Sequence, residues 1–112
     1  MALNINERRD SGVIVLQPAG RIDNDTSLVF QDRLLKVIAE GTTLVDFTSV
    51  EFISSAGLAA LMTAAKQAKS ASAKIACANL NPVVQEIFAI SRFSRVIPVY
   101  GSAADGIAAL TA

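Results

Sequence analysis

Two adjacent serines, Ser54 and Ser55, stand where an apolar stretch gives way to a helical pattern. A serine hydroxyl at a helix start accepts a hydrogen bond from a free backbone N–H group, so a helix cap is the ordinary role of this pair. Gly57 follows among alanines, although glycine costs a helix roughly 1 kcal/mol relative to alanine. Its presence indicates that something approaches the backbone closely. The free N–H groups of the first turn would also suit an anion such as a phosphate.

Two acidic residues, Asp23 and Asp46, end two of the predicted strands. Right-handed crossovers place strand-to-helix loops at one edge of an α/β sheet, where functional sites tend to lie. Both carboxylates could therefore lie near Ser54 and Ser55. Each acid could instead simply cap the segment that follows it. Two acids and two serines at one edge together favour a functional surface.

The sequence lacks the residues that several kinds of catalytic site require. The chain has no histidine and a single cysteine, Cys77, which lies in an apolar run and is expected to be buried. These counts exclude histidine-based triads, thiolate or imidazole metal clusters and disulfides. The serine junction contains no lysine, no glycine-rich run and no G-x-S-x-G elbow. We therefore predict no enzyme, no metal and no cofactor, and a nucleotide-binding or enzymatic role is the least favoured hypothesis.

The composition is that of one globular domain. The 112 residues, 52% of them apolar, are enough for a single core, and one domain is predicted over residues 1–112. The net charge is zero and no basic stripe occurs, so nucleic-acid binding has no support. The N-terminus lacks a signal-peptide pattern. The longest apolar helical run, 56–65, is about half of the roughly 20 residues that a membrane span needs. These features favour a soluble cytoplasmic protein.

The order of elements predicts an α/β fold that would position these residues. Strands are expected over 3–8, 13–17 with a continuation through 19–22, 42–46, 74–78 and 96–100, and helices over 26–39, 54–69, from 81 and from 102. A turn at 10–12 joins the first two strands, and a loop is expected over 47–53. The third helix should bury Val84, Ile87 and Phe88. The second should face the core with Leu58, Leu61, Met62 and Ala65. We predict a mixed sheet of four to five strands with about four helices mainly on one face.

The stretch LVDFTSVEFISSAGLAAL, residues 44–61, resembles the signature of the STAS domain of bacterial anti-sigma factor antagonists. The turn Gly20-Arg21-Ile22-Asp23 is similar to the family's turn before its first helix. The tail NLNPVVQEIFAISRFSRVIPVY, residues 79–100, is similar to the family's third helix and last strand. The resemblance runs in order over nearly the whole chain, so it implies a STAS-like fold.

The resemblance also implies a mechanism. The unphosphorylated antagonist of this family binds an anti-sigma factor that is also a serine kinase, and so frees the sigma factor. The kinase phosphorylates a serine at the start of the second helix, the complex dissociates, and a PP2C-type phosphatase resets the protein. The resemblance places partner binding at seven residues: Asp23, Asp46, Ser54, Ser55, Ala56, Gly57 and Leu58.

The phosphorylation motif departs from the family's Asp-Ser-Ser-Gly. Ser54 replaces the aspartate, Ser55 keeps the first serine, and Ala56 occupies the usual acceptor position. We predict Ser55 as the acceptor, with Ser54 as the second choice. Ala56 favours an alternative, in which the chain is a non-phosphorylated STAS scaffold or accessory subunit of a transport or signalling complex.

Overall fold

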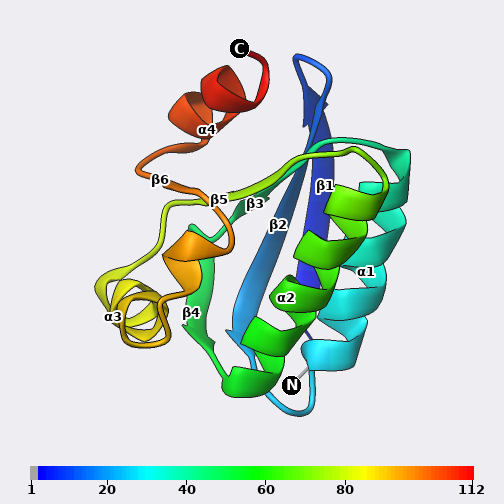
Figure 1. The fold of residues 1–112 in the computed structure, drawn as a ribbon. Helices are drawn as coiled ribbons and strands as arrows, with labels where there is room; N and C mark the ends of the chain where they lie inside the picture. The colour runs from blue at the N-terminus through cyan, green and yellow to red at the C-terminus, as the bar shows by residue number, and fades with distance from the viewer. Residues whose placement is uncertain (1–2) are drawn as a thin grey trace.

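The computed structural model describes residues 3–112 as one mixed sheet flanked by helices (Figure 1). Within these residues the sheet has six strands in the order β1-β2-β3-β5-β6, and β4 also pairs with β2. The elements are β1 (Asn4–Asp10), β2 (Val13–Ile22), α1 (Ser27–Glu40), β3 (Thr43–Asp46), β4 (Ser49–Ile53), α2 (Ser55–Ser70), β5 (Ile75–Ala78), α3 (Pro82–Ile90), the 3-10 turn η1 (Phe93–Arg95), β6 (Val99–Tyr100) and α4 (Ala103–Leu110). The α/β class is confirmed, with one strand more than the four to five expected.

The first two strands form the predicted hairpin. β1 and β2 pair antiparallel, and the register brings Asp10 opposite Val13. Ser11 and Gly12 between them have φ angles of 55° and 81°. Two positive φ values suit the tight hairpin turn whose twist matches that of the strands. β2 continues through Pro18 to Ile22 with a register shift near Gly20, as the sequence indicated.

The loop expected over 47–53 is wrong, because Ser49–Ile53 is a strand, β4. β3 and β4 both run parallel to β2, beside Ile14–Leu16 and beside Ala19–Ile22 respectively. The register shift places the inward residues Val50 and Ile53 three positions apart instead of two. This irregularity hides the alternation by which a half-buried strand is recognised in a sequence.

The main core lies between the sheet and the three helices α1, α2 and α3. α1 and α2 lie side by side over one face of the sheet (Figure 1). α1 buries the residues expected of it, namely Phe30, Leu34, Val37 and Ile38. On α2 only Leu61 of the four predicted core residues is fully buried. Leu58, Met62 and Ala65 are only partly buried, and the small residues Ala60, Ala64 and Ala68 occupy buried positions of α2 instead.

The helix α4 covers part of the opposite face, so the helices lie mainly but not entirely on one side. Ile107 of α4 packs against Val13, Val15 and Leu44 in a second, smaller cluster. The last strand is shorter than the predicted 96–100 and comprises only Val99–Tyr100. Residues 96–98 form a turn and a bend instead of a strand, and they follow the 3-10 turn η1, in which Phe93 packs against the ring of Phe88.

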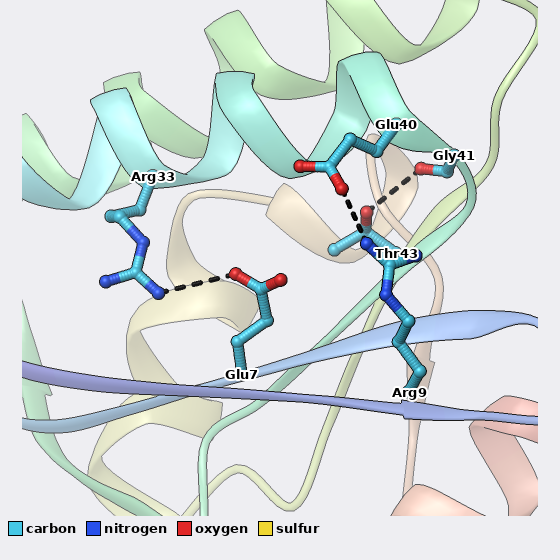
Figure 2. A network of polar contacts seen from close by, with 6 residues as sticks. All are labelled: Glu7, Arg9, Arg33, Glu40, Gly41 and Thr43. Atoms are coloured by element: carbon cyan, nitrogen blue, oxygen red, sulfur yellow. Dashed lines mark hydrogen bonds and ion pairs between the residues drawn. The ribbon is translucent and has the colours of Figure 1, made fainter.

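The strand β1 at the sheet edge is linked to α1 by polar contacts (Figure 2). Arg33 on α1 donates to Glu7 on β1 at 3.4 Å, and Arg9 on β1 donates to Glu40 on α1. Nearby, the Thr43 hydroxyl donates to the Gly41 carbonyl at 3.1 Å. Exposed ion pairs contribute about 0–1 kcal/mol each, so these contacts favour the observed placement of α1 beside β1 but add little to the overall stability.

Within residues 3–112, no helix combines the length and the apolar character needed to cross a lipid bilayer.

Candidate functional site

Ser54 is the N-cap of α2, which is its ordinary structural role. Its side-chain oxygen accepts a hydrogen bond from the Gly57 N–H at 3.2 Å. Its own N–H donates to the Ile22 carbonyl at 2.8 Å. The first bond caps α2, so the Ser54 hydroxyl has a defined structural role, and the second joins the start of α2 to the end of β2.

Ser55 is the first residue of α2 and is exposed, whereas Ser54 is half-buried. Within the described part of the chain, no side-chain hydrogen bond occupies the Ser55 hydroxyl, while that of Ser54 serves the cap. Ser55 is therefore the more accessible hydroxyl of the pair. The next residue, Ala56, is half-buried in the same turn.

Gly57 is required by packing. A Cβ atom built on it would lie 2.6 Å from Ile53 Cγ1 and 2.7 Å from Ile22 Cγ2. The close approach that the sequence predicted is confirmed, and it is made by two strand side chains. Gly57 thus allows the first turn of α2 to sit directly on the ends of β2 and β4. The partly buried Leu58 packs against the same core.

Asp23 follows β2 directly and lies beside Ser54, which bonds to the preceding residue, Ile22. The Asp23 carboxylate accepts from the backbone N–H groups of Asp25 at 3.0 Å and Thr26 at 3.2 Å. Asp23 therefore shapes the turn that leads into α1. It does not cap the helix itself, because the N-cap of α1 is Thr26, which has no side-chain capping bond.

Sequence reasoning missed two exposed apolar residues in the first turn of α1. Leu28 is 69% exposed and Val29 is 53% exposed. α1 and α2 begin at the same end of the sheet (Figure 1), so Leu28 and Val29 share that end with the serines. One signal of their exposure was available in the sequence, because both precede Phe30, the first of the predicted core-facing residues of this helix. We call Asp23, Leu28, Val29, Ser54 and Ser55 the helix-start surface.

Asp46 lies away from this surface, contrary to the expected proximity. It ends β3 at the level of Gln17, whereas Ser54 follows β4 at the level of Asp23. At roughly 3.3 Å per residue along β2, these levels are about 20 Å apart. The strand β4, which was expected to be a loop, separates them.

Asp46 is only 5% exposed and is surrounded by neutral donors. Its Oδ1 accepts from the Thr48 N–H at 3.0 Å, the Thr48 hydroxyl at 2.6 Å and the Asn79 amide at 3.0 Å. Its Oδ2 accepts from the Gln17 amide at 3.1 Å. Burial acts to raise the pKa of Asp46, but the bonds from Thr48, Asn79 and Gln17 outweigh it, so the pKa lies below its ordinary value.

The described residues contain no group of three or more histidine, cysteine, aspartate or glutamate side chains that could hold a metal ion. Cys77 is fully buried, and this burial raises the pKa of its thiol. A buried thiol that stays protonated is a poor nucleophile and a poor metal ligand.

A family model described as "Mlab, STAS domain" matches residues 5–98 of the chain. The chain belongs to the STAS domain family. A relative of this STAS protein, "Putative anti-sigma factor antagonist BtrV" of Bordetella bronchiseptica, is 35% identical over 63 residues. That match covers 56% of the chain and only 54% of BtrV.

Two solved structures share the STAS fold. An anti-sigma factor antagonist from Mycobacterium paratuberculosis superposes with a TM-score of 0.89 at 20% identity, covering 98% of this chain and 95% of that one. The anti-sigma factor antagonist SpoIIAA, in its unphosphorylated form, superposes with a TM-score of 0.77 at 14% identity and covers 93% of each chain. At these identities the likeness establishes the fold.

Proposed function

We propose that this STAS protein is an anti-sigma factor antagonist that binds a serine-kinase anti-sigma factor through the helix-start surface. Phosphorylation of Ser55 releases the partner, and a PP2C-type phosphatase resets the protein. The observation that carries the proposal is an exposed hydroxyl, unused by the fold, at the start of α2. The similarity to BtrV supports the choice of partner class. The protein then acts as a non-enzymatic regulator in the cytoplasm.

The helix-start surface has the mixed character of a protein interface. Leu28 and Val29 place exposed apolar side chains at the same end of the sheet as the polar groups of Asp23 and Ser55. The few side chains that a partner fully desolvates at the centre of an interface contribute most of the binding energy, and the rim around them is polar. Ala56 and Leu58 lie in the first turn of α2 with Ser55. Gly57 in that turn packs against Ile22 and Ile53 of the sheet. Asp46 is too far along β2 to join this interface.

Phosphorylation at Ser55 would act on binding and leave the fold in place. A phosphoserine carries about −1.5 to −2 charges at neutral pH, and the dipole of α2 tolerates this charge at its N-terminus. The neighbouring turn adds the carboxylates of Asp23 and Asp25. A partner that covers Ser55 would have to desolvate the phosphate beside these acids. A loss of about 2–3 kcal/mol would weaken affinity roughly 30- to 150-fold.

Ser54 remains the second choice as acceptor. Its side-chain oxygen accepts the capping bond from Gly57 N–H, and a phosphate there would replace that bond. Modification of Ser54 would thus alter the start of α2, whereas modification of Ser55 would change only the surface. Phosphorylation of Ser54 should therefore lower the stability of the fold, whereas phosphorylation of Ser55 should leave it unchanged.

The test is binding to the purified cognate kinase anti-sigma factor by calorimetry. We expect Ser55→Ala to bind like the wild type, and Ser55→Asp to bind roughly tenfold or more weakly. Leu28→Ala should also weaken binding. Ile90→Ala is the matched control, because Ile90 is equally apolar, 75% exposed and located on α3. Wild-type affinity for Ser55→Asp, or equal losses for Leu28→Ala and Ile90→Ala, would contradict the proposed surface.

A non-phosphorylated scaffold or accessory role is the second candidate, and Ala56 at the family's usual acceptor position favours it. Incubation with the kinase and ATP, followed by intact-mass measurement, separates the two. A mass increase of one phosphoryl group that disappears in Ser55→Ala supports the switch. An unchanged mass together with stable partner binding supports the scaffold.

A further inference from the structure

A polar hollow lies on the face of the sheet that α4 covers only in part. On β2, alternation places Gln17 and Ala19 on the same side as Val13 and Val15, which α4 covers. The hollow has a volume of about 200 Å³, room for about six waters at roughly 30 Å³ each. It is lined by Asn6, Gln17, Ala19, Asp46, Thr48 and Ser49. The side chain of Ala19 is too small to fill it.

The charge on the floor of the hollow is not balanced. Among residues 3–112 the ion pairs join Arg8 to Asp10, Arg9 to Glu40 and Arg33 to Glu7, and none of them includes Asp46. The four hydrogen bonds that hold the Asp46 carboxylate all come from neutral donors. A carboxylate that is mostly buried without a cation is an unusual arrangement, because buried charges are normally paired.

The lining also has unused acceptors. Asp46 Oδ1 accepts three of the four bonds, so Oδ2, which accepts only from Gln17, retains a free lone pair. The amides of Gln17 and Asn6 add carbonyl oxygens, and Thr48 adds a hydroxyl oxygen. These acceptors come from β1, from β2 and from the β3–β4 connection. A ligand that matches them must carry several donors and a positive charge.

We propose that this hollow binds a guanidinium group. A guanidinium presents five N–H donors in a planar fork and pairs strongly with carboxylate oxygens. The hard cations Mg²⁺ and Ca²⁺ fit less well, because Asp46 is the only carboxylate among the described residues of the lining. The group is supplied either by an arginine side chain of another protein or by a small guanidinium compound. The site is independent of the helix-start surface, so it needs no kinase for its test.

The first experiment is an NMR titration of the full chain with N-acetyl-arginine-methylamide, followed through backbone amide shifts. The matched control compound is the citrulline analogue, which keeps the shape and lacks the charge. We expect saturable shifts at Gln17, Ala19 and Thr48 with the arginine compound, and at least tenfold weaker binding of the citrulline compound. Equal binding of the two compounds, or shifts that do not saturate, would overturn the proposal. Tighter binding of the lysine analogue would overturn the choice of guanidinium.

Two variants test the site itself. Ala19→Leu fills the hollow without touching the carboxylate, and Ala89→Leu makes the same change at an exposed position on α3. We expect the first to weaken arginine-compound binding at least tenfold and the second to leave it unchanged. Asp46→Asn should abolish binding, but it also disturbs the hydrogen bonds of Asp46, so Ala19→Leu is the deciding variant. Unchanged affinity in Ala19→Leu would refute the site.

Two further ligands distinguish whether the guanidinium group comes from a protein or from a small compound. A short peptide with one internal arginine represents a protein partner, and free L-arginine represents a small molecule. Tighter binding of the peptide supports an arginine side chain as the occupant, and tighter binding of L-arginine supports a small compound. Binding of neither would overturn the proposal.

Discussion

Substitution of Gly57 by alanine should destabilise the protein, against the usual effect of this change in a helix. Gly57 has no positive φ angle and lies in the first turn of α2. On propensity alone, alanine would stabilise the helix by up to about 1 kcal/mol. The added methyl would instead meet Ile53 Cγ1 at 2.6 Å and Ile22 Cγ2 at 2.7 Å, distances at which atoms must move.

The magnitude follows from the two opposing effects. Overpacking a well-packed core costs typically about 1–3 kcal/mol. Both contacts of Gly57 are with β-branched side chains, and Ile22 and Ile53 are almost completely buried. Their shape leaves little room for rearrangement, so the cost should lie in the upper half of that range. After the propensity gain is subtracted, we expect a net loss of about 1–2 kcal/mol.

Urea unfolding followed by circular dichroism measures this loss. With a slope of about 1.5 kcal/mol per M, the midpoint should fall by roughly 1 M. Gly101→Ala is the matched control, because a Cβ there meets nothing within 4 Å and its backbone angle needs no glycine. We expect its midpoint to stay or to rise slightly. A Gly57→Ala protein as stable as the wild type would refute the packing account of this glycine.

Two further predictions concern the cap and the buried acid. Ser54→Ala should lose about 1 kcal/mol of unfolding free energy with the Gly57 capping bond, whereas Ser55→Ala should stay within about 0.5 kcal/mol of the wild type, both measured by urea unfolding. Because the pKa of Asp46 is lowered on folding from its ordinary 3.8, its stabilising contribution is complete above that value and is lost as pH falls through the folded pKa. Asp46→Asn should therefore lower stability at pH 7 and reduce the fall in stability between pH 5 and pH 3. An equally steep fall in the variant would count against Asp46 as its source.

The expected helix caps were correct for α2, α3 and α4, but α1 begins without a side-chain capping bond at its N-cap, Thr26. Ser54, Asn81 and Ser102 all accept the expected N-terminal N–H bond, from Gly57, Val84 and Asp105 respectively. A cap involves residues three apart, so sequence alone contains the whole interaction. The hairpin turn at 11–12 and the buried face of α1 were also predictable, because each depends on residues that are close together in the sequence.

Features that depend on pairing between distant segments could not be predicted in this way. β4 was missed because a register shift in its pairing with β2 places its inward residues, Val50 and Ile53, three positions apart, which breaks the alternation expected of a strand. The burial of α2 was displaced toward Ala60 and Ala64, because its neighbours on the sheet and on α1 decide which side chains fit. The exposure of Leu28 and Val29 likewise depends on what the fold leaves uncovered.

The α/β class and the serine cap could be predicted from the sequence, because they depend on periodicity and on a short-range hydrogen bond. A glycine among alanines indicated a close approach at Gly57, but the residues that approach it, Ile22 and Ile53, and the accessibility of each serine depend on the tertiary fold. The tertiary structure also separated Asp46 from Ser54 by the length of β4 and placed Asp46 in a hollow with Asn6 and Gln17. The pairing of β3 and β4 with β2 joins segments that are far apart in the sequence, so the register that sets which chemical groups meet is fixed only when the sheet forms.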